Sequence, residues 1–273
     1  MKKTKSNDKK STSWSPINTW YDQYVGEEGS PFHQHVIFPG IARLVNVQKP
    51  LMSVMHWLDL ACGQGVLQRT FTNPMIHHVG IDLSEALIQT AQQRNTSPNV
   101  RYFVGDATQL LQENGPCVLP LQPHAFDVIT IVLAIQNMSH LSPVWKAAKT
   151  LLKPKGKLVI VMMHPSFRIP KASDWQWNEK DHRQERVLWS YLSSQEIPIL
   201  ANPGNPKSQT MTPHFHRPLQ AYINTLGNAG LYVDHLEEWV SHVGEQASDK
   251  SEALLKAKKE FPMFMAIRAI NID

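Results

Sequence analysis

The sequence contains little cysteine and no long apolar run. Its only cysteines among 273 residues are Cys62 and Cys117, and neither has a CxxC or metal-type spacing. A disulfide framework is therefore not expected, and a reducing cytoplasm is the predicted location.

No stretch approaches the roughly 18 uninterrupted apolar residues of a membrane span. The start, "MKKTKSNDKKSTS", leads into polar residues and not into the apolar segment of a secretory signal. We expect a soluble protein without a membrane partner.

Net charge is also missing from most of the chain. The formal charge is +4, and residues 1–10 account for all of it with five lysines and one aspartate. Basic and acidic residues balance in the remainder. Because nucleic-acid binding favours a clustered basic face, a nucleic-acid partner is not expected.

The chain does contain an alternation of short apolar runs and helical patterns. The runs are rich in Val and Ile with little alternation, which is typical of parallel strands covered on both faces. They occupy residues 54–60, 76–82, 100–104, 126–133 and 157–163. Ser84 is a candidate N-cap, and so is Ser142, with Pro143 at the first helical position. The pattern predicts an α/β fold with an open, doubly wound, mostly parallel sheet.

The segments of the chain differ in composition. We expect a disordered basic tail at 1–13, an N-terminal helical cap at 14–50, a core at 51–163 and 213–273, and an insertion at 164–212. The insertion carries Trp175, Trp177, Trp189 and Tyr191. Long insertions are usually functional or disordered, and large aromatics argue against disorder. A lid over an apolar ligand is therefore favoured over a hydrophobic patch that only holds the segment down.

The stretch "HWLDLACGQGVLQRTF", residues 56–71, indicates a strand, a turn around Gly63 and Gly65, and a helix start. Small residues let the backbone approach a ligand, and a helix start presents free N–H groups. A dinucleotide fingerprint, GxGxxG, would need a third glycine at position 68, which is Gln68. This difference counts against NAD.

Three acidic residues, Asp59, Asp82 and Asp106, lie at the ends of the first three predicted strands. Because ligands of open α/β sheets bind at the carboxyl ends of the strands, we expect the three to line one crevice. Asp82 follows Gly65 by 17 residues, where a carboxylate can accept both hydroxyls of a ribose. Each acid could instead cap a helix or turn, but that explanation is weaker for three in register.

Five stretches together resemble the successive motifs of class I S-adenosylmethionine-dependent methyltransferases over about residues 54–165: "LDLACGQGVL", "VGIDLSEALIQTA", "VRYFVGDATQL", "FDVITIVLAIQNM" and "LLKPKGKLVIVMMHP". The stretch "HFHRPLQAYINTLGNAGLYVDHLEEW" is similar to the end of a bacterial branch that acts on small molecules. The family often has its first glycine where this chain has Ala61. The resemblance implies a Rossmann-like, seven-stranded sheet that ends in an antiparallel pair, with S-adenosyl-L-methionine as cofactor.

The resemblance also implies roles for individual residues. Asp59 would lie near the amino group of the cofactor, and Asp82 would take the ribose hydroxyls. Leu83 would pack on the adenine, and Asp106 with the Ala107 amide would read the adenine edge. The backbone of the glycine turn would hold the methionine part through Ala61, Cys62, Gly63 and Gly65. Leu133 to Gln136 would face the sulfonium, with Leu133 beside the cofactor and Gln136 beside the acceptor.

A general base is needed only if the acceptor is protonated, since methyl transfer depends mostly on position and orientation. His164, at the end of the fifth predicted strand, and His214, after the insertion, are the candidate catalytic residues. His164 could equally hydrogen-bond within the turn before Pro165. His216 and Trp175 are candidates for contacting the acceptor.

Two histidine pairs, "HQH" at 33–35 and "HFH" at 214–216, would share one face if they lay on strands. No cysteine or acidic cluster at ligand spacing accompanies them, so no metal site is predicted.

We therefore expect an enzyme that transfers a methyl group from S-adenosylmethionine to an O, N or C nucleophile of a small molecule. The alternatives are an RNA or protein methyltransferase built on the same core and a non-catalytic S-adenosylmethionine-binding protein.

Overall fold

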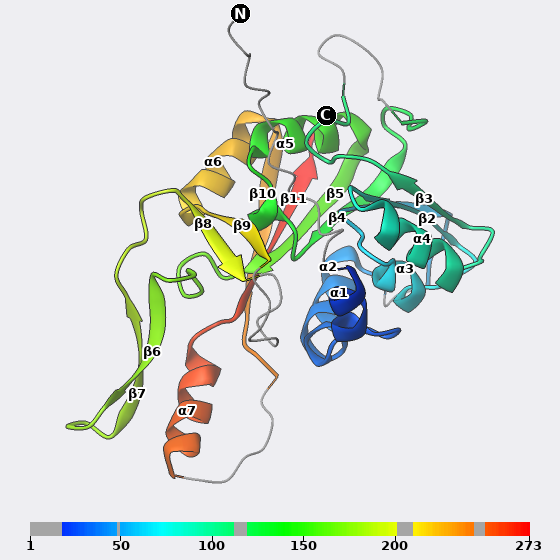
Figure 1. Cartoon of the computed structure of the whole chain (residues 1–273). Coiled ribbons are helices and arrows are strands. Elements are labelled where there is room, and N and C mark those ends of the chain that lie inside the picture. The colour runs from blue at the N-terminus through cyan, green and yellow to red at the C-terminus, as the bar shows by residue number, and fades with distance from the viewer. Residues whose placement is uncertain (1–17, 48–49, 112–118, 201–209, 243–248) are drawn as a thin grey trace, which may run out of the picture.

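The computed structural model describes residues 18–47, 50–111, 119–200, 210–242 and 249–273. The predicted tail at 1–13 lies outside these residues. One sheet forms the centre of the molecule, in the order β10-β11-β5-β4-β1-β2-β3 (Figure 1). Its strands are β1 Met55–Leu60, β2 Ile76–Asp82, β3 Val100–Val104, β4 Phe126–Val132, β5 Leu152–Met163, β10 Leu231–Trp239 and β11 Phe264–Asn271.

The sheet is parallel except at β11, which runs antiparallel to both β5 and β10. The predicted fold class, a mostly parallel seven-stranded sheet, is confirmed. The chain proceeds from β1 to β2 and β3 on one side, whereas β4 and β5 lie on the other. The order thus reverses between β1 and β4, and open α/β sheets bind ligands outside the carboxyl ends of their strands at such a point.

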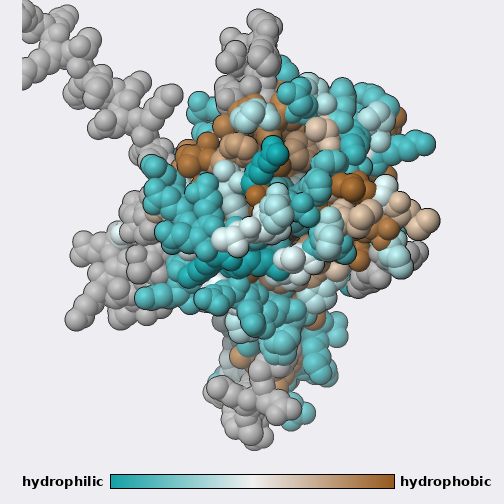
Figure 2. Space-filling model, turned by 90° about the vertical axis from the view of Figure 1, so that its right-hand side faces the viewer, coloured by the Kyte–Doolittle hydropathy of each residue, from teal (hydrophilic) through white to brown (hydrophobic). Residues whose placement is uncertain are grey.

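Helices cover both faces of the sheet (Figure 1). They are α1 Asn18–Val25, α2 Phe38–Val45, α3 Val66–Thr70, α4 Glu85–Arg94, α5 Leu141–Leu151, α6 Leu219–Asn228 and α7 Asp249–Glu260, with a π-helical turn at His33–Ile37 and a 3-10 turn at Ile135–Asn137. Within the described residues no helix has the length and apolarity needed to cross a membrane. Figure 2 shows one side of the surface, where hydrophobic residues lie in separate patches among hydrophilic ones.

The helix starts agree with the sequence at one position and differ at another. The Ser84 hydroxyl accepts a hydrogen bond from the Leu87 N–H at 3.4 Å and caps α4, as predicted. The predicted cap at Ser142 is wrong, because α5 already begins at Leu141, after His140, and no side chain caps it. Leu141 is buried in the core, so the apolar contacts of the helix start before the serine.

Two buried clusters hold the layers together. The indole of Trp145, in α5, is fully buried and donates a hydrogen bond to the Thr225 hydroxyl of α6 at 2.9 Å. On the other face, Ile41 and Leu44 of α2 pack in one cluster with Trp57 of β1. The N-terminal helical segment is therefore part of the core packing.

The insertion forms two hairpins, made of β6 Ser173–Asn178 with β7 Arg183–Leu188 and of β8 Gln195–Leu200 with β9 Met211–His216. The predicted boundary at residue 212 falls inside β9. The β6–β7 hairpin extends beyond the sheet beside α7 (Figure 1). Trp175 lies edge-on to Phe261 at 5.6 Å, and the guanidinium groups of Arg168 and Arg186 lie over its ring.

The packing of α2 depends on a glycine. A Cβ at Gly40 would overlap the indole of Trp239, which is itself buried at the end of β10. A Cβ at Gly227, in α6, would meet no atom of the described residues within 4 Å. Both glycines lie in helices, but only Gly40 has a neighbour that a methyl group would overlap, so Gly227 is a suitable control for substitution of Gly40 by alanine.

Gly40→Ala should lower the free energy of unfolding, because overpacking a filled site costs about 1–3 kcal/mol and the gain in helix propensity is at most about 1 kcal/mol. Gly227→Ala should raise the free energy of unfolding by about 0.4–1 kcal/mol, because it meets no obstacle. Chemical denaturation measures both. Equal effects of the two substitutions would contradict the packing of α2 on Trp239.

Candidate active site

The turn after β1 has a left-handed backbone at three positions. The angle φ is 61° at Ala61, 56° at Gly63 and 76° at Gly65. Glycine adopts this conformation freely, whereas a residue with a Cβ loses about 1–2 kcal/mol in it. Ala61 therefore adopts a conformation that favours glycine, the residue often found at this position in the family that the sequence resembles.

The ring of Tyr102 lies against the turn and limits the size of its neighbours. A Cβ at Gly65 would overlap the Tyr102 hydroxyl group, and one at Gly80 would lie 2.7 Å from Cδ1 of the ring and 2.8 Å from the Cys62 sulfur. Cys62 is buried in a small cluster with Tyr102, and its thiol is directed at the Gly63 carbonyl at 3.6 Å. The side chain of Cys62 therefore serves packing.

A cavity of about 590 Å³ opens at the carboxyl edge of the sheet. Its wall includes many of the predicted cofactor residues, namely Ala61, Gly63, Asp82, Leu83, Asp106, Ala107 and Leu133. Further wall residues come from the N-terminal segment and from the region around the start of α5: Tyr24, Val25, His33, Asn137, Met138, Ser139, His140 and Pro143. The cavity thus joins the strand ends to the N-terminal cap.

The carboxylate of Asp82 is fixed by backbone groups. One oxygen accepts the Gly63 N–H at 2.8 Å, and the other accepts the Ser84 N–H at 2.8 Å. Burial raises the pKa of Asp82, and these two hydrogen bonds oppose the shift. Each oxygen keeps a second lone pair, so the side chain can accept two more hydrogen bonds from a molecule in the cavity.

Asp106 is held in a similar way after β3. One oxygen accepts both the N–H and the hydroxyl of Thr108, at 2.8 and 2.7 Å, and the other accepts the Gln109 amide at 3.0 Å. Two of the three strand-end acids therefore line the cavity as predicted.

The prediction that Asp59 also lines the crevice is wrong. Asp59 is only 2% exposed, and its oxygens accept the Thr130 hydroxyl at 2.7 Å and the Gln68 amide at 3.1 Å. Thr130 is its register partner on β4, so the carboxyl group lies between two strands and not beyond their ends. Burial raises the pKa of Asp59 to about 7, against the effect of the two hydrogen bonds.

The side chain of Gln64 ties the N-terminal segment to the glycine turn. Its amide donates to the Gly26 carbonyl at 2.7 Å, and its oxygen accepts from Arg94 at 2.5 Å and Arg69 at 2.6 Å. Arg94 also makes a two-bond ion pair with Asp22 of α1, at 2.6 and 2.7 Å. These contacts hold α1 and the chain after it beside the cavity.

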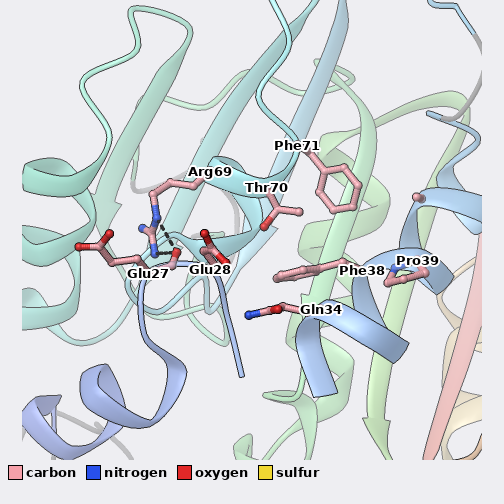
Figure 3. A pocket seen from close by; sticks show the side chains of 9 residues that line it. Glu27, Glu28, Gln34, Phe38, Pro39, Arg69, Thr70 and Phe71 are labelled. Carbon is pink, nitrogen blue, oxygen red and sulfur yellow. Dashed lines mark hydrogen bonds between the residues drawn. The ribbon is translucent and has the colours of Figure 1, made fainter. Parts of the chain in front are cut away.

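Arg69 extends this connection to Glu27, whose carbonyl accepts two hydrogen bonds from the guanidinium, at 3.2 and 3.0 Å. Figure 3 shows this contact at the side of a second, more open groove between the N-terminal segment and α3. The apolar lining of that groove includes Phe38, Pro39 and Phe71.

His164 lies away from the cavity wall. It is 2% exposed, its Nδ1 accepts the Ser166 N–H at 3.1 Å, and its Nε2 lies 2.7 Å from the Glu238 carboxylate. Both ring nitrogens are thus occupied within the protein, with Nε2–H as the donor to Glu238. This arrangement supports the turn-anchor interpretation of His164.

The other predicted acceptor residues are also absent from the cavity wall. His214 and His216 are buried on β9, and His216 Nε2 donates to the Tyr191 carbonyl at 2.7 Å. Gln136 is buried, and its amide donates to the Leu133 carbonyl at 2.8 Å. Trp175 packs between the arginines and Phe261 as described above. The catalytic and acceptor-binding roles assigned to these residues stay predictions.

His33 lies on the cavity wall, where the sequence did not place it. On a strand the pair at 33–35 would share one face, but these residues form a π-helical turn in which His33 is buried and His35 is exposed. The two imidazoles therefore point in different directions. No group of three or more His, Cys, Asp or Glu within the described part of the chain is arranged to hold a metal ion.

Comparison with known proteins supports the same core. Residues 58–160 match the methyltransferase domain family. Over 110 residues the chain is 31% identical to demethylmenaquinone methyltransferase of Thermotoga maritima, covering 40% of this chain and 43% of the relative. Over 141 residues it is 28% identical to ubiquinone biosynthesis O-methyltransferase of Acinetobacter baumannii, covering 50% of this chain and 54% of the relative. The chain thus spans about half the length of the curated relatives it matches.

A solved structure resembles nearly the whole fold. The S-adenosylmethionine-dependent methyltransferase of Mesorhizobium loti superposes with a TM-score of 0.62 at 20% identity, over 84% of this chain and 96% of the other. Together with the sheet order, these matches show that residues 58–160 form a methyltransferase domain and that the chain has the fold of class I S-adenosylmethionine-dependent methyltransferases.

Proposed function

We propose that this protein transfers a methyl group from S-adenosylmethionine to a small-molecule acceptor. The observation that carries the proposal is the cavity itself, which has two fixed carboxylates, Asp82 and Asp106, on one side and the N-terminal cap on the other. The cytoplasm stays the predicted compartment, on the basis of cysteine usage.

The chemistry of the cavity fits the cofactor. The free lone pairs of Asp82 suit the two ribose hydroxyls, and the exposed side chain of Leu83 suits packing on the adenine. Asp106 and the Ala107 amide lie on the same wall and suit the adenine edge. When bound, the cofactor supplies an electrophilic methyl group, and the residues of the chain bind and orient the two reactants.

The buried carboxyl group of Asp59 also favours a cationic ligand near the glycine turn. Its carboxyl group is buried without a cationic partner among the described residues, and the charge of Asp82 further raises its pKa. A cationic group near the glycine turn would favour the ionised form of Asp59. The ammonium of the cofactor is such a group, although Asp59 would act on it through the turn and not by lining the cavity.

The other wall of the cavity favours a small acceptor that contains a ring. Tyr24, Val25, Met138 and Pro143 provide aromatic and apolar surface there. The segment that carries Tyr24 and Val25 is fixed over the cavity by the contacts of Gln64. The curated relatives are named for methylation of demethylmenaquinone and for O-methylation in ubiquinone biosynthesis, which agrees with a small acceptor. Basic and acidic residues balance outside residues 1–10, which counts against RNA as the acceptor, because RNA binding depends on basic contacts to phosphates.

Asp82→Ala should weaken the binding of S-adenosylhomocysteine by about 2–4 kcal/mol, since each charge-assisted hydrogen bond contributes roughly 1.5–3 kcal/mol and water replaces part of the loss. Isothermal titration calorimetry measures the affinity. Asp127→Ala is the matched control, because Asp127 lies near the amino end of β4 and pairs with Lys153. No binding of millimolar S-adenosylhomocysteine to the folded wild type would reject the proposed function, and an unchanged affinity in Asp82→Ala would reject the role of Asp82.

The pKa of Asp59 predicts how stability depends on pH without cofactor. The folded-state pKa of about 7 lies above the unfolded value of 3.8, so between these values the folded protein binds more protons than the unfolded chain. The free energy of unfolding contributed by this group is therefore present in full below about pH 4 and is lost as the pH rises to about 7. Asp59→Asn should remove this part of the pH dependence. Denaturant titrations from pH 4 to 8 measure it, and parallel curves for both proteins would contradict the shifted pKa.

A further inference from the structure

His33 is the histidine that the N-terminal cap contributes to the cavity wall. It is 6% exposed and begins the π-helical turn His33–Ile37. Such turns are rare and frequently occur at functional sites. None of the histidines proposed from the sequence, at 164, 214 and 216, lies on this wall.

The imidazole of His33 is fixed from one side. Its Nδ1 lies 2.8 Å from the Ser30 hydroxyl, and both residues are buried. A Cβ at Gly29 would lie 2.7 Å from the His33 Cβ, and Gly29 has a φ of 92°, so a glycine allows this close packing. No partner for the His33 Nε2 occurs among the described residues. One nitrogen is therefore anchored, and the other remains available to a molecule in the cavity.

The position of His33 depends on the glycine turn. Gln64 and Arg69 hold the carbonyls of Gly26 and Glu27, a few residues before Ser30. The same turn supplies Ala61 and Gly63 to the cofactor side of the cavity. These contacts thus fix the position of the His33 imidazole relative to the turn that is proposed to bind the cofactor.

We propose that His33 is the general base of the reaction and that the acceptor atom is a hydroxyl oxygen on a ring. This inference rests on the proposed function. With Nδ1–H donating to Ser30, Nε2 takes the proton of the acceptor hydroxyl. The oxygen lone pair forms the new O–CH₃ bond, the S–CH₃ bond breaks with its electron pair going to sulfur, and the cofactor leaves as neutral-sulfur S-adenosylhomocysteine. The imidazolium then gives the proton to water.

The surroundings keep His33 in the form that a base requires. Burial lowers its pKa to about 4, so Nε2 is unprotonated near pH 7, and the imidazolium formed during transfer loses its proton readily. The other titratable groups on the cavity wall are Tyr24, Asp82, Asp106 and His140. His140 is exposed, and its Nδ1 contacts the Ser139 hydroxyl at 2.8 Å, which makes it the competing base in this cavity.

The experiment compares variants in a methylation assay with methyl-labelled S-adenosylmethionine and three ring-hydroxyl probes: catechol, 4-nitrocatechol and caffeic acid. His33→Ala and His33→Gln should lower kcat by about 10²–10⁴, the usual contribution of a general base, and leave the affinity for S-adenosylhomocysteine unchanged. His35→Ala is the matched control, because His35 lies in the same turn but is exposed. Its kcat should equal that of the wild type.

Chemical rescue separates catalysis from packing. Free imidazole should restore part of the activity of His33→Ala, because it can occupy the vacated space and accept the proton, and it should not change His33→Gln, in which the space is filled. A purely structural role for His33 would give a loss of activity that imidazole does not restore, together with a lowered Tm, and would overturn the proposal.

The remaining outcomes are distinct. Full activity in His33→Ala with loss of activity in His140→Ala would assign the base to His140 and overturn the proposal. A wild type that binds S-adenosylhomocysteine but methylates none of the three hydroxyl probes, or only amine probes such as tyramine at nitrogen, would also overturn it and leave the proposed function standing. Failure to bind S-adenosylhomocysteine would reject the proposed function itself.

Discussion

The position of the turn after β1 is the constraint on which the site depends. The ring of Tyr102 lies so close that positions 65 and 80 admit only glycine without rearrangement. With the turn held there, the Gly63 N–H reaches Asp82 and the Gln64 side chain reaches the N-terminal segment. One close approach of a backbone to an aromatic ring thus positions both the Asp82 side of the cavity and the N-terminal segment beside it.

The sequence was sufficient for the parts of the fold that local pattern controls. Runs of Val and Ile located the strands of the sheet to within a few residues, because such runs are typical of strands buried on both faces. The exception is β5, which begins at Leu152, five residues before the predicted run. The carboxyl ends of parallel strands must meet at one edge, so the strand pattern alone places Asp82 and Asp106 together. The family motifs then specified the cofactor, which no spacing of residues alone could have named.

The direction of a side chain could not be predicted from the sequence where it depends on a partner far along the chain. Asp59 precedes the end of β1 by one residue, so its direction is set by Thr130 on the neighbouring strand. His164 is fixed by Glu238, 74 residues away. His33 reaches the cavity only because α1 and the following chain fold over the turn. None of these contacts leaves a periodic signal, and 13 histidines in the sequence made the choice among them arbitrary.

The acidic groups at and behind the cavity wall affect how strongly cofactor and product bind. Asp59 and Asp82 both have a raised pKa because burial disfavours their ionised forms. A ligand with positive charge stabilises those forms, whereas a neutral one leaves the desolvation cost unbalanced. In the proposed reaction the sulfonium becomes a neutral thioether, so the product presents one positive charge fewer to the acidic edge. The electrostatic contribution to binding therefore falls at the moment of transfer, which favours exchange of the product for a new cationic cofactor.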